Sequence, residues 1–449
     1  MSMKLKKLSL SNFRGFEQLD IDFCDDITVI AGVNGSGKSS LLRAISGIAS
    51  YCLPEFTPAK KETFSFTGTD IYAEKPSLSI SITFQTEKQM LYAEVLRSSS
   101  LSPNKISSLT AEREDIRAQR RFVKKGLSED TKFEERLNTI DQLLKKPEDY
   151  FSWQSEKGES ESRNPLIVYY STNRSFSHLP PRLSKVKPLT PTDAYTNSLR
   201  TNQISLNDFA NWYRAAKNGL LGGEKLGVTL IQMLDSVIKA MLPNFLDLIL
   251  IDHPKPYFKV KKENIYFELE QLSEGERGIL ALAFDLTRRL TLANPESSNP
   301  IAEGSALVMI DEIELHLHPT WQRQVLRRLT STFKNCQFIV TTHSPLVLGE
   351  VGARCIRFLE REEQTNKVIS TIPSESYGLD ANRILGELMG TSERNKEVTE
   401  TLHQIFKLID DESFDEAHQA MIPLIEKIGE LDPEITRAQT LIKFLEGEE

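Results

Sequence analysis

The chain has 449 residues, 39% hydrophobic and 26% charged, a composition typical of a folded globular protein and not of a disordered or fibrous one. Its 63 acidic and 55 basic residues give a net charge of -8, which argues against a protein coated in positive charge for wrapping nucleic acid. The four cysteines form no CxxC pair, and no apolar run approaches the roughly twenty residues that cross a bilayer. We therefore expect a cytoplasmic protein without a zinc site, a disulfide framework or a membrane span.

Residues 1–97 begin with strands that lead into a glycine-rich loop. Apolar residues alternate in KLKKLSLSNF and LDIDF, and DITVIAG is a compact apolar run that ends in glycine. These patterns predict strands, and SLLRAISGIASYCL after the loop has helical spacing. Residues 77–96 predict a further antiparallel strand pair.

Residues 98–262 differ in composition from the segment before them. Ser, Lys, Arg and Glu dominate residues 98–163, which predicts an inserted helical arm. PLIVYYSTNRSF restores strand character, and amphipathic helices follow through LIQMLDSVIKAMLP. A second strand group, ILIDHPKPYFKVKKENIYFELEQL, comes next.

Residues 263–376 contain two buried-strand runs, ALVMIDE and CQFIVTTHSP, separated by the helical segment WQRQVLRRLTSTF. This order predicts parallel pairing within one sheet. Residues 377–449 are charged and helical, and we expect them to form a tail that binds a partner. The predicted fold class is α/β.

The stretch GVNGSGKSS fits the spacing G-x-x-x-x-G-K-[ST] between a predicted strand and a predicted helix. Glycines let the backbone curl around a β-phosphate, Lys38 reaches the β and γ oxygens, and the Ser39 hydroxyl takes a Mg²⁺ position. A chance glycine-rich turn is the alternative, and the flanking elements disfavour it. The predicted ATP-binding residues of this phosphate loop are Gly32, Asn34, Gly35, Ser36, Gly37, Lys38, Ser39 and Ser40.

Two further strand ends carry polar residues. LVMIDE ends in Asp311, which can hold Mg²⁺ through water, and in Glu312, which can polarise the attacking water. His343 follows the next strand, where it can hydrogen-bond a γ-phosphate. A lone histidine is more often structural, but its place one strand after LVMIDE favours a functional role. We predict that Glu312 and His343 are catalytic and that Asp311 binds the metal.

In this order, NFRGF, GVNGSGKSS, LSEGER, LVMIDE, IELHLHP and TTHSP resemble the ABC-type ATPases of the SMC, RecF and OLD group, over about residues 1–95 and 265–360. The resemblance implies an ATPase that uses ATP and Mg²⁺. It also implies an ABC-type P-loop ATPase head, with a mixed sheet and flanking helices, an antiparallel N-terminal sheet, an inserted helical lobe and a C-terminal helical tail.

The resemblance makes residues 272–277 the signature loop, which would face the nucleotide held by the other subunit of a homodimer. The physical pattern agrees, because QLSEGERG precedes an apolar helical run and a helix N-terminus receives anions. The predicted nucleotide contacts are Ser273, Gly275 and Glu276. The loop departs from the commoner LSGGQ form, because Glu274 and Glu276-Arg277 replace Gly and Gln. Negative charge beside a phosphate is unfavourable unless the side chain points away.

The same resemblance suggests three smaller assignments. Arg14 in NFRGF is the early arginine that lies over the phosphates, and residues 314–319 form the loop that crosses the dimer interface. Gln85 is a candidate for the metal-contacting glutamine, and residues 172–174 compete with it for that role. For each of them, an ordinary solvated polar residue at a strand end is the alternative interpretation.

Three hypotheses describe the output of the ATPase. In the first, the chain resembles the PtuA ATPases of Septu antiphage systems, on the basis of its single-lobe insertion, DEIELHLHP and the tail GELDPEITRAQTLIKFLE. This resemblance implies a homodimer or higher oligomer that hydrolyses ATP and controls a partner HNH nuclease, with no nuclease site of its own.

The second hypothesis is a self-sufficient OLD-type nuclease. It needs a metal-binding Toprim domain, but LIDDESFDEA lies within helical periodicity with no apolar strand before it. The third hypothesis is a RecF-like DNA-binding repair ATPase without a nuclease partner. The arm helix AEREDIRAQRRFVKK, with six basic and three acidic residues, could contact DNA phosphates, and a solvated helix face is the alternative interpretation.

Overall fold

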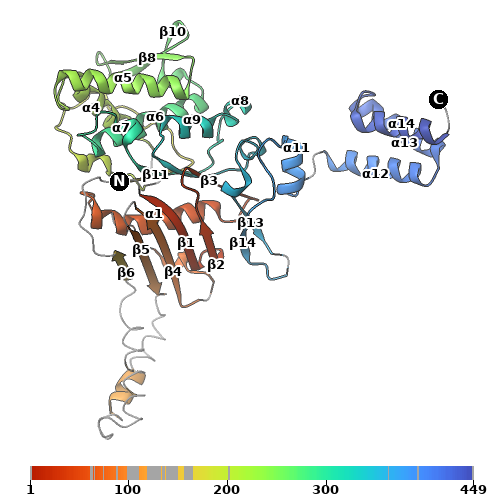
Figure 1. The fold of residues 1–449 in the computed structure, drawn as a ribbon, viewed down its shortest axis with the longest axis horizontal. Coiled ribbons are helices and arrows are strands. Elements are labelled where there is room, and N and C mark those ends of the chain that lie inside the picture. Colours follow the sequence, from red (N-terminus) through yellow and green to blue (C-terminus); the bar gives the residue numbers. More distant parts are fainter. Residues whose placement is uncertain are drawn as a thin grey trace. The chain divides into compact units, whose positions relative to one another are not determined.

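The computed structural model describes residues 3–60, 64, 66–73, 75–86, 89–98, 111–118, 133, 137, 150–155, 165–200, 203–362, 364–391 and 394–446. The chain divides into two compact units, Met1–Leu379 and Asp380–Glu449 (Figure 1). Within the predicted arm, residues 111–118 are helical, and the basic end of the predicted arm helix lies outside the described residues. None of the helices in the described ranges combines the length and the apolar character needed to span a membrane.

The first unit begins with a five-stranded antiparallel sheet in the order β2-β1-β4-β5-β6. Its strands are β1 (Lys4–Phe13), β2 (Phe16–Asp22), β4 (Ser77–Gln85), β5 (Met90–Ser98) and β6 (Tyr150–Ser155). The predicted alternation is confirmed, since every second residue of β4 is buried. β6 was not predicted, because this six-residue strand lies inside a segment whose charged composition indicated helices.

A six-stranded sheet in the order β14-β13-β3-β12-β11-β7 forms the centre of the same unit. Only β14 runs antiparallel to its neighbour. The central strands are buried throughout, as expected of a parallel sheet covered on both faces. The strands are β3 (Ile27–Gly32), β7 (Leu166–Tyr170), β11 (Ala306–Ile310), β12 (Gln337–Thr341), β13 (Ile356–Arg361) and β14 (Val368–Thr371).

The parallel pairing predicted for β11 and β12 is confirmed. Because the strands are parallel, the carboxyl ends of β3, β12, β11 and β7 meet at one edge of the sheet, where ligands of such folds bind. The helix α1 (Lys38–Phe56) contacts β3 and β7 of this sheet and β4 and β5 of the N-terminal sheet. The phosphate loop before α1 follows β3 of the central sheet and packs against Phe16 of β2 in the N-terminal sheet.

The remaining part of the first unit is a helical lobe with a small sheet. The sheet consists of β8 (Phe245–Ile251), β9 (Tyr257–Lys262) and β10 (Ile265–Glu268). The further helices are α4 (Leu206–Lys217), α5 (Glu224–Met241), α6 (Glu274–Ala293), α7 (Pro300–Glu303), α8 (Pro319–Gln322), α9 (Val325–Thr332) and α10 (Pro345–Leu348), with 3-10 turns η1 (Gly68–Asp70), η2 (Pro191–Ala194), η3 (Leu269–Gln271) and η4 (Ala353–Cys355).

The helix α6 is the centre of the lobe and carries a buried ionic cluster. The Asp285 carboxylate accepts hydrogen bonds from Arg288 (2.8 Å), Arg289 (2.6 Å) and the Tyr170 hydroxyl of β7 (3.0 Å). Burial alone would raise the pKa of Asp285, but the two guanidinium groups lower it to about 2. The cluster thus ties α6 to the central sheet, and the single Asp285 carboxylate is the counter-ion of two buried guanidinium groups, which also donate to backbone carbonyl oxygens.

We expect Asp285→Asn to destabilise the protein by about 3–5 kcal/mol, because it leaves two buried guanidinium groups without their counter-ion. The pKa is lower in the folded state than in the unfolded chain, so the stabilising contribution is complete above the unfolded-state pKa of about 4. Denaturant unfolding should show the same difference at pH 8 and pH 6, which shrinks only as the pH falls from about 4 towards 2. Equal stability of mutant and wild type at pH 7 would contradict this account.

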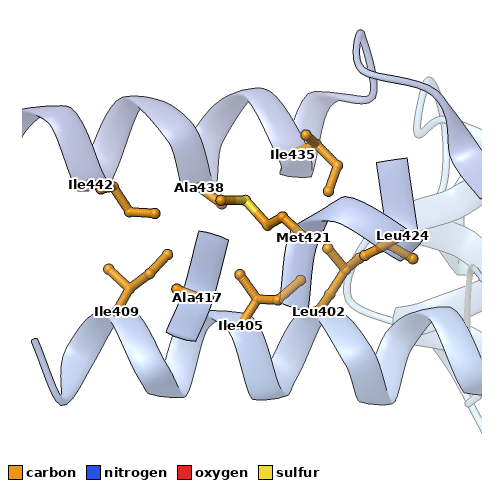
Figure 2. Packing of buried hydrophobic residues seen from close by; sticks show 9 residues of the cluster. All are labelled: Leu402, Ile405, Ile409, Ala417, Met421, Leu424, Ile435, Ala438 and Ile442. Carbon is orange, nitrogen blue, oxygen red and sulfur yellow. The ribbon is translucent and has the colours of Figure 1, made fainter. Parts of the chain in front are cut away.

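The second unit is a three-helix bundle that follows a short helical segment. Its elements are α11 (Ala381–Arg383), a π-helical turn (Ile384–Leu388), α12 (Lys396–Asp410), α13 (Phe414–Ile428) and α14 (Pro433–Glu446). Side chains at helical spacing build its own core, as Figure 2 shows for Leu402 and Ile405 of α12, Met421 of α13 and Ile435 of α14. With this helical tail, the predicted α/β fold class is confirmed.

Candidate active site

The loop between β3 and α1 has the strand-loop-helix form that its sequence predicts. Gly32 and Gly37 have φ values of 146° and 99°, which glycine adopts readily. A Cβ atom at Gly32 would lie 2.3 Å from the carbonyl oxygen of Leu359, and one at Gly37 would lie 2.4 Å from the Phe16 ring. The glycines are therefore required both by the curl of the loop and by the atoms packed against it.

Lys38 closes the loop from inside. Its ammonium group donates hydrogen bonds to the carbonyl oxygens of Gly32 (2.9 Å) and Val33 (3.0 Å). Burial lowers the pKa of Lys38, and the carboxylates that follow β11 oppose this effect. A lysine held between loop carbonyls and nearby carboxylates has its charge directed into the space that phosphate oxygens would occupy.

The Ser36 hydroxyl gives an independent sign that the loop accepts a ligand. Its side chain is 2% exposed, and the hydroxyl oxygen has no hydrogen-bond partner among the described residues. A buried hydroxyl without a hydrogen-bond partner is unfavourable. An oxygen atom of a ligand bound in the loop would supply the missing partner. Asn34 and Ser39 are exposed at the mouth of the loop, and Ser40 is half-buried.

Arg14 lies at the first turn of α1. Its guanidinium group donates to the Asp70 carboxylate (2.8 Å) and to the Ser40 hydroxyl (3.3 Å). The backbone N–H of Arg14 also donates to the carbonyl oxygen of Asp70 (2.8 Å). Asp70 is buried, so it fixes the arginine beside the loop, a support that no local sequence pattern indicated.

Asp311 and Glu312 follow β11 and are held by the neighbouring strand. The Thr341 hydroxyl at the end of β12 donates to the Asp311 carboxylate (2.5 Å) and accepts the N–H of Glu312 (2.8 Å). Asp311 is buried, whereas Glu312 is half-buried. Thr341 was not predicted as a site residue, although the sequence shows two hydroxyl residues just before His343.

His343 follows β12 and contacts the same group of carboxylates. The backbone N–H of His343 donates to the Glu314 carboxylate (2.5 Å), which also accepts from the Thr342 hydroxyl (2.8 Å). Burial lowers the pKa of His343, and the charge of Lys38 lowers it further. The ring is therefore uncharged at neutral pH and can donate or accept a hydrogen bond. Glu314 begins the loop that is predicted to cross a dimer interface, and its carboxylate bonds residues of its own subunit.

Gln85 and residues 172–174, the two candidates for the metal contact, lie at opposite ends of the strands. Gln85 pairs with Lys4, the first residue of β1. Arg14, which contacts the first turn of α1, follows the last residue of β1. A ten-residue strand spans roughly 30 Å, and Lys4 contacts Asn335 just before β12. The prediction that Gln85 contacts the metal is therefore wrong, because strand direction places it at the amino ends of the parallel strands.

Residues 172–174 do lie at the carboxyl edge, since β7 pairs with β11 in parallel. Thr172 and Asn173 are exposed there, but Arg174 is 6% exposed. Its guanidinium group donates to the carbonyl oxygens of Asp311 and Glu312, both at 2.7 Å. Arg174 thus bonds the backbone of the two acidic residues, and its positively charged guanidinium group is not a metal ligand.

The signature loop begins α6 with a capping box. Ser273 accepts the N–H of Glu276 (3.3 Å), and the Glu276 carboxylate accepts from the N–H (3.0 Å) and hydroxyl (2.9 Å) of Ser273. Lys262 of β9 donates to the same carboxylate (2.7 Å). With Glu276 only 5% exposed, both its carboxylate and its N–H are bonded within the capping box, so neither group is free for the predicted nucleotide contact of this residue.

Gly275 packs against residues 314–319. A Cβ atom there would lie 2.4 Å from the carbonyl oxygen of His316, and the exposed Glu274 carboxylate lies 3.2 Å from the His316 ring. Within the described part of the chain, the N–H groups of Glu274 and Gly275 make no hydrogen bond, and no ion pair or hydrogen bond joins this loop to residues 32–40. The loop thus offers free N–H groups that are not bonded to its own phosphate loop.

Residues 27–349 match the model of the family described as "AAA domain, putative AbiEii toxin, Type IV TA system". The chain belongs to this AAA-domain family. It is an ATPase, as predicted from the phosphate loop and the carboxylates after β11.

Relatives of this AAA-domain protein carry names from two systems. The chain is 27% identical to "Retron Ec83 probable ATPase" of Escherichia coli, over 92% of this chain and 81% of that protein. It is 28% identical to "Septu protein PtuA" of Bacillus mycoides, over 62% of this chain and 41% of that protein. The SMC head bound to the C-winged helix domain of ScpA matches at 16% identity with a TM-score of 0.44, over 83% of this chain and 98% of that one. The predicted resemblance to PtuA-type ATPases is confirmed.

Proposed function

We propose that this protein is the ATP-hydrolysing subunit of an antiphage defence complex, in which two copies close around ATP and control a partner HNH nuclease. The observation that carries the proposal is that one chain presents two groups suited to phosphate that share no hydrogen bond or ion pair among the described residues. One is the phosphate loop with its carboxylates at the sheet edge, and the other is the pair of free N–H groups at the start of α6. Relatives named for Septu and retron systems support the defence role.

The residues at the sheet edge suit a nucleotide with Mg²⁺. Lys38 and the curled backbone would hold the phosphates, with the orphan Ser36 hydroxyl beside them. The Ser39 hydroxyl and the Asp311 carboxylate are the hard oxygen donors that Mg²⁺ prefers. When bound, the ion would neutralise charge on the phosphate oxygens.

The chain's own residues would then act by position. The Glu312 carboxylate orients a water molecule and accepts its proton, since phosphoryl transfer needs mainly alignment and charge neutralisation. The neutral His343 ring donates a hydrogen bond to the γ-phosphate. The bond between the backbone N–H of His343 and the Glu314 carboxylate fixes the residue in this place. Arg14 adds positive charge at the first turn of α1.

The signature loop completes the site of the opposite copy in this proposal. The N–H groups of Glu274 and Gly275 and the positive end of α6 face the phosphates bound by the partner subunit. Glu276 does not oppose this contact, because its carboxylate is buried between Ser273 and Lys262. Two head-to-tail copies form two such sites, so ATP holds the dimer together.

Ser273→Arg tests this arrangement. ATP binding by calorimetry should be nearly unchanged, because the phosphate loop is intact, while hydrolysis and ATP-dependent dimerisation should be lost. Mixed with Lys38→Ala, it should regain activity, since each mixed dimer contains one intact phosphate loop facing one intact signature loop. Ser205→Arg is the matched control, because Ser205 caps α4 in the same way and should leave hydrolysis unaffected. If exchanging subunits form neither an active site nor an ATP-trapped dimer, the proposal is wrong.

The nuclease half of the proposal has its own test. If an HNH nuclease gene neighbours this one, its product should co-purify with the wild-type chain. A chain that binds DNA alone and retains no such nuclease would instead favour the RecF-like alternative.

A further inference from the structure

Glu312 has an unusual backbone conformation. Its φ is 46°, in the left-handed region that a residue with a Cβ atom enters at an energetic cost. Such conformations persist only where the surrounding structure holds them, and they occur often at active sites. The residue that the proposed function makes catalytic therefore depends on groups that fix its backbone.

Two side chains, one at the end of β12 and one in the loop after β7, hold the peptide groups around Glu312. The Thr341 hydroxyl accepts its N–H (2.8 Å), and the Arg174 guanidinium donates to its carbonyl oxygen (2.7 Å). The other terminal nitrogen of Arg174 donates to the carbonyl oxygen of Asp311 (2.7 Å). The planar guanidinium group thus bonds two successive carbonyl groups through two nitrogens, whereas an ammonium group has only one nitrogen to place.

Arg174 is buried beside the acidic residues that follow β11. The loop after β7 brings the arginine to β11, because the N–H of Asp311 donates to the carbonyl oxygen of Tyr170 (2.9 Å). Burial lowers the pKa of Arg174, and the charges of Glu314, Asp311 and Glu312 oppose this. A buried charge that bonds backbone carbonyls has to be held by structure around it. Within the described ranges, the guanidinium group of Arg174 donates only to backbone carbonyl oxygens of residues 171 and 311–313, none of which belongs to the phosphate loop.

We propose that Arg174 is a positioning residue for ATP hydrolysis, which fixes the left-handed backbone of Glu312 and so aims its carboxylate at the attacking water. This inference rests on the proposed catalytic role of Glu312. It predicts that loss of Arg174 lowers turnover and leaves ATP affinity unchanged, because its contacts lie on the acidic side of the site.

The test compares Arg174→Met, Arg174→Lys and Arg357→Met. We expect Arg174→Met to lower kcat by about 100-fold, the scale of a small misplacement of a reacting group, with little change in KM. Arg174→Lys keeps the charge but has a single donating nitrogen in place of the planar fork, so its kcat should fall between those of wild type and Arg174→Met.

Arg357 is the matched control for a purely structural effect. It is a buried arginine that donates to the carbonyl oxygens of Asp22 (2.8 Å) and Arg354 (2.7 Å), at the amino side of β13. Arg357→Met should therefore lower thermal stability but keep wild-type kcat per folded molecule. If Arg174→Met behaves in the same way, the positioning role is wrong. If Arg174→Met does not fold, Arg174→Lys decides by the same comparison.

A double mutant separates action through Glu312 from an independent effect. Because Arg174 acts on Glu312, adding Arg174→Met to Glu312→Gln should cause no further loss of turnover. A second loss of similar size would overturn the inference. Full turnover in Glu312→Gln alone would instead remove the catalytic assignment on which the inference rests, and full turnover in Arg174→Met with an inactive Glu312→Gln would refute only the inference.

Discussion

Lys38→Ala is expected to abolish ATP hydrolysis and to weaken ATP binding at least about tenfold. The ammonium group already lies inside the loop, between the carbonyl oxygens of Gly32 and Val33, and no other lysine is buried within the described residues. Hydrogen bonds to charged groups contribute about 1.5–3 kcal/mol each, which corresponds to about 10- to 150-fold in affinity.

Calorimetry with ATP and a steady-state hydrolysis assay measure the two effects. Lys4→Ala is the control, because Lys4 also donates to a backbone carbonyl, that of Asn335, but lies at the other end of the parallel strands. Unchanged ATP affinity in Lys38→Ala would remove the phosphate-loop assignment. Equal losses in both variants would show a general effect on folding.

Glu312→Gln should keep ATP bound while turnover falls by about 100-fold or more. The amide has the shape of the carboxylate but cannot accept the proton of the attacking water, and general bases contribute about 10²–10⁴-fold. The backbone of Glu312 is fixed by Thr341 and Arg174, so this substitution should change the chemistry without moving the loop.

Single-turnover hydrolysis and nucleotide binding measure this effect, and trapped ATP should increase the dimer fraction in sedimentation. Glu350→Gln is the control, since Glu350 forms a surface pair with Arg323 and should show wild-type turnover. Undiminished hydrolysis by Glu312→Gln would transfer the catalytic role to another residue.

The features that the sequence predicted correctly are those whose cause is local. GVNGSGKSS carries its own glycines and lysine, and ALVMIDE carries a buried strand with two carboxylates at its end. Strand-helix-strand order then brings Asp311 and His343 to one edge without further information. The fold class followed for the same reason.

The errors concern side chains whose partners are distant in sequence. Glu276 turns into its helix cap because Lys262 of β9 reaches it, and the pattern LSEGER does not show where that carboxylate points. Gln85 was misplaced because a strand-end position does not specify which end of the sheet it occupies. Arg174 binds carbonyl groups 137 and 138 residues away, a relation that no local spacing reveals.

The contact between Gly275 and His316 has a consequence for a dimer of this protein. Glu314 bonds the backbone of His343, and two residues later the carbonyl group of His316 packs on Gly275. In the proposed dimer, His343 senses one ATP and Gly275 faces the other. Three residues, Glu314 to His316, then connect the two nucleotide sites. Because the His316 carbonyl group packs directly on the backbone of Gly275, a movement at one site should be transmitted to the other. Hydrolysis should therefore be cooperative, with a Hill coefficient above one in ATP concentration.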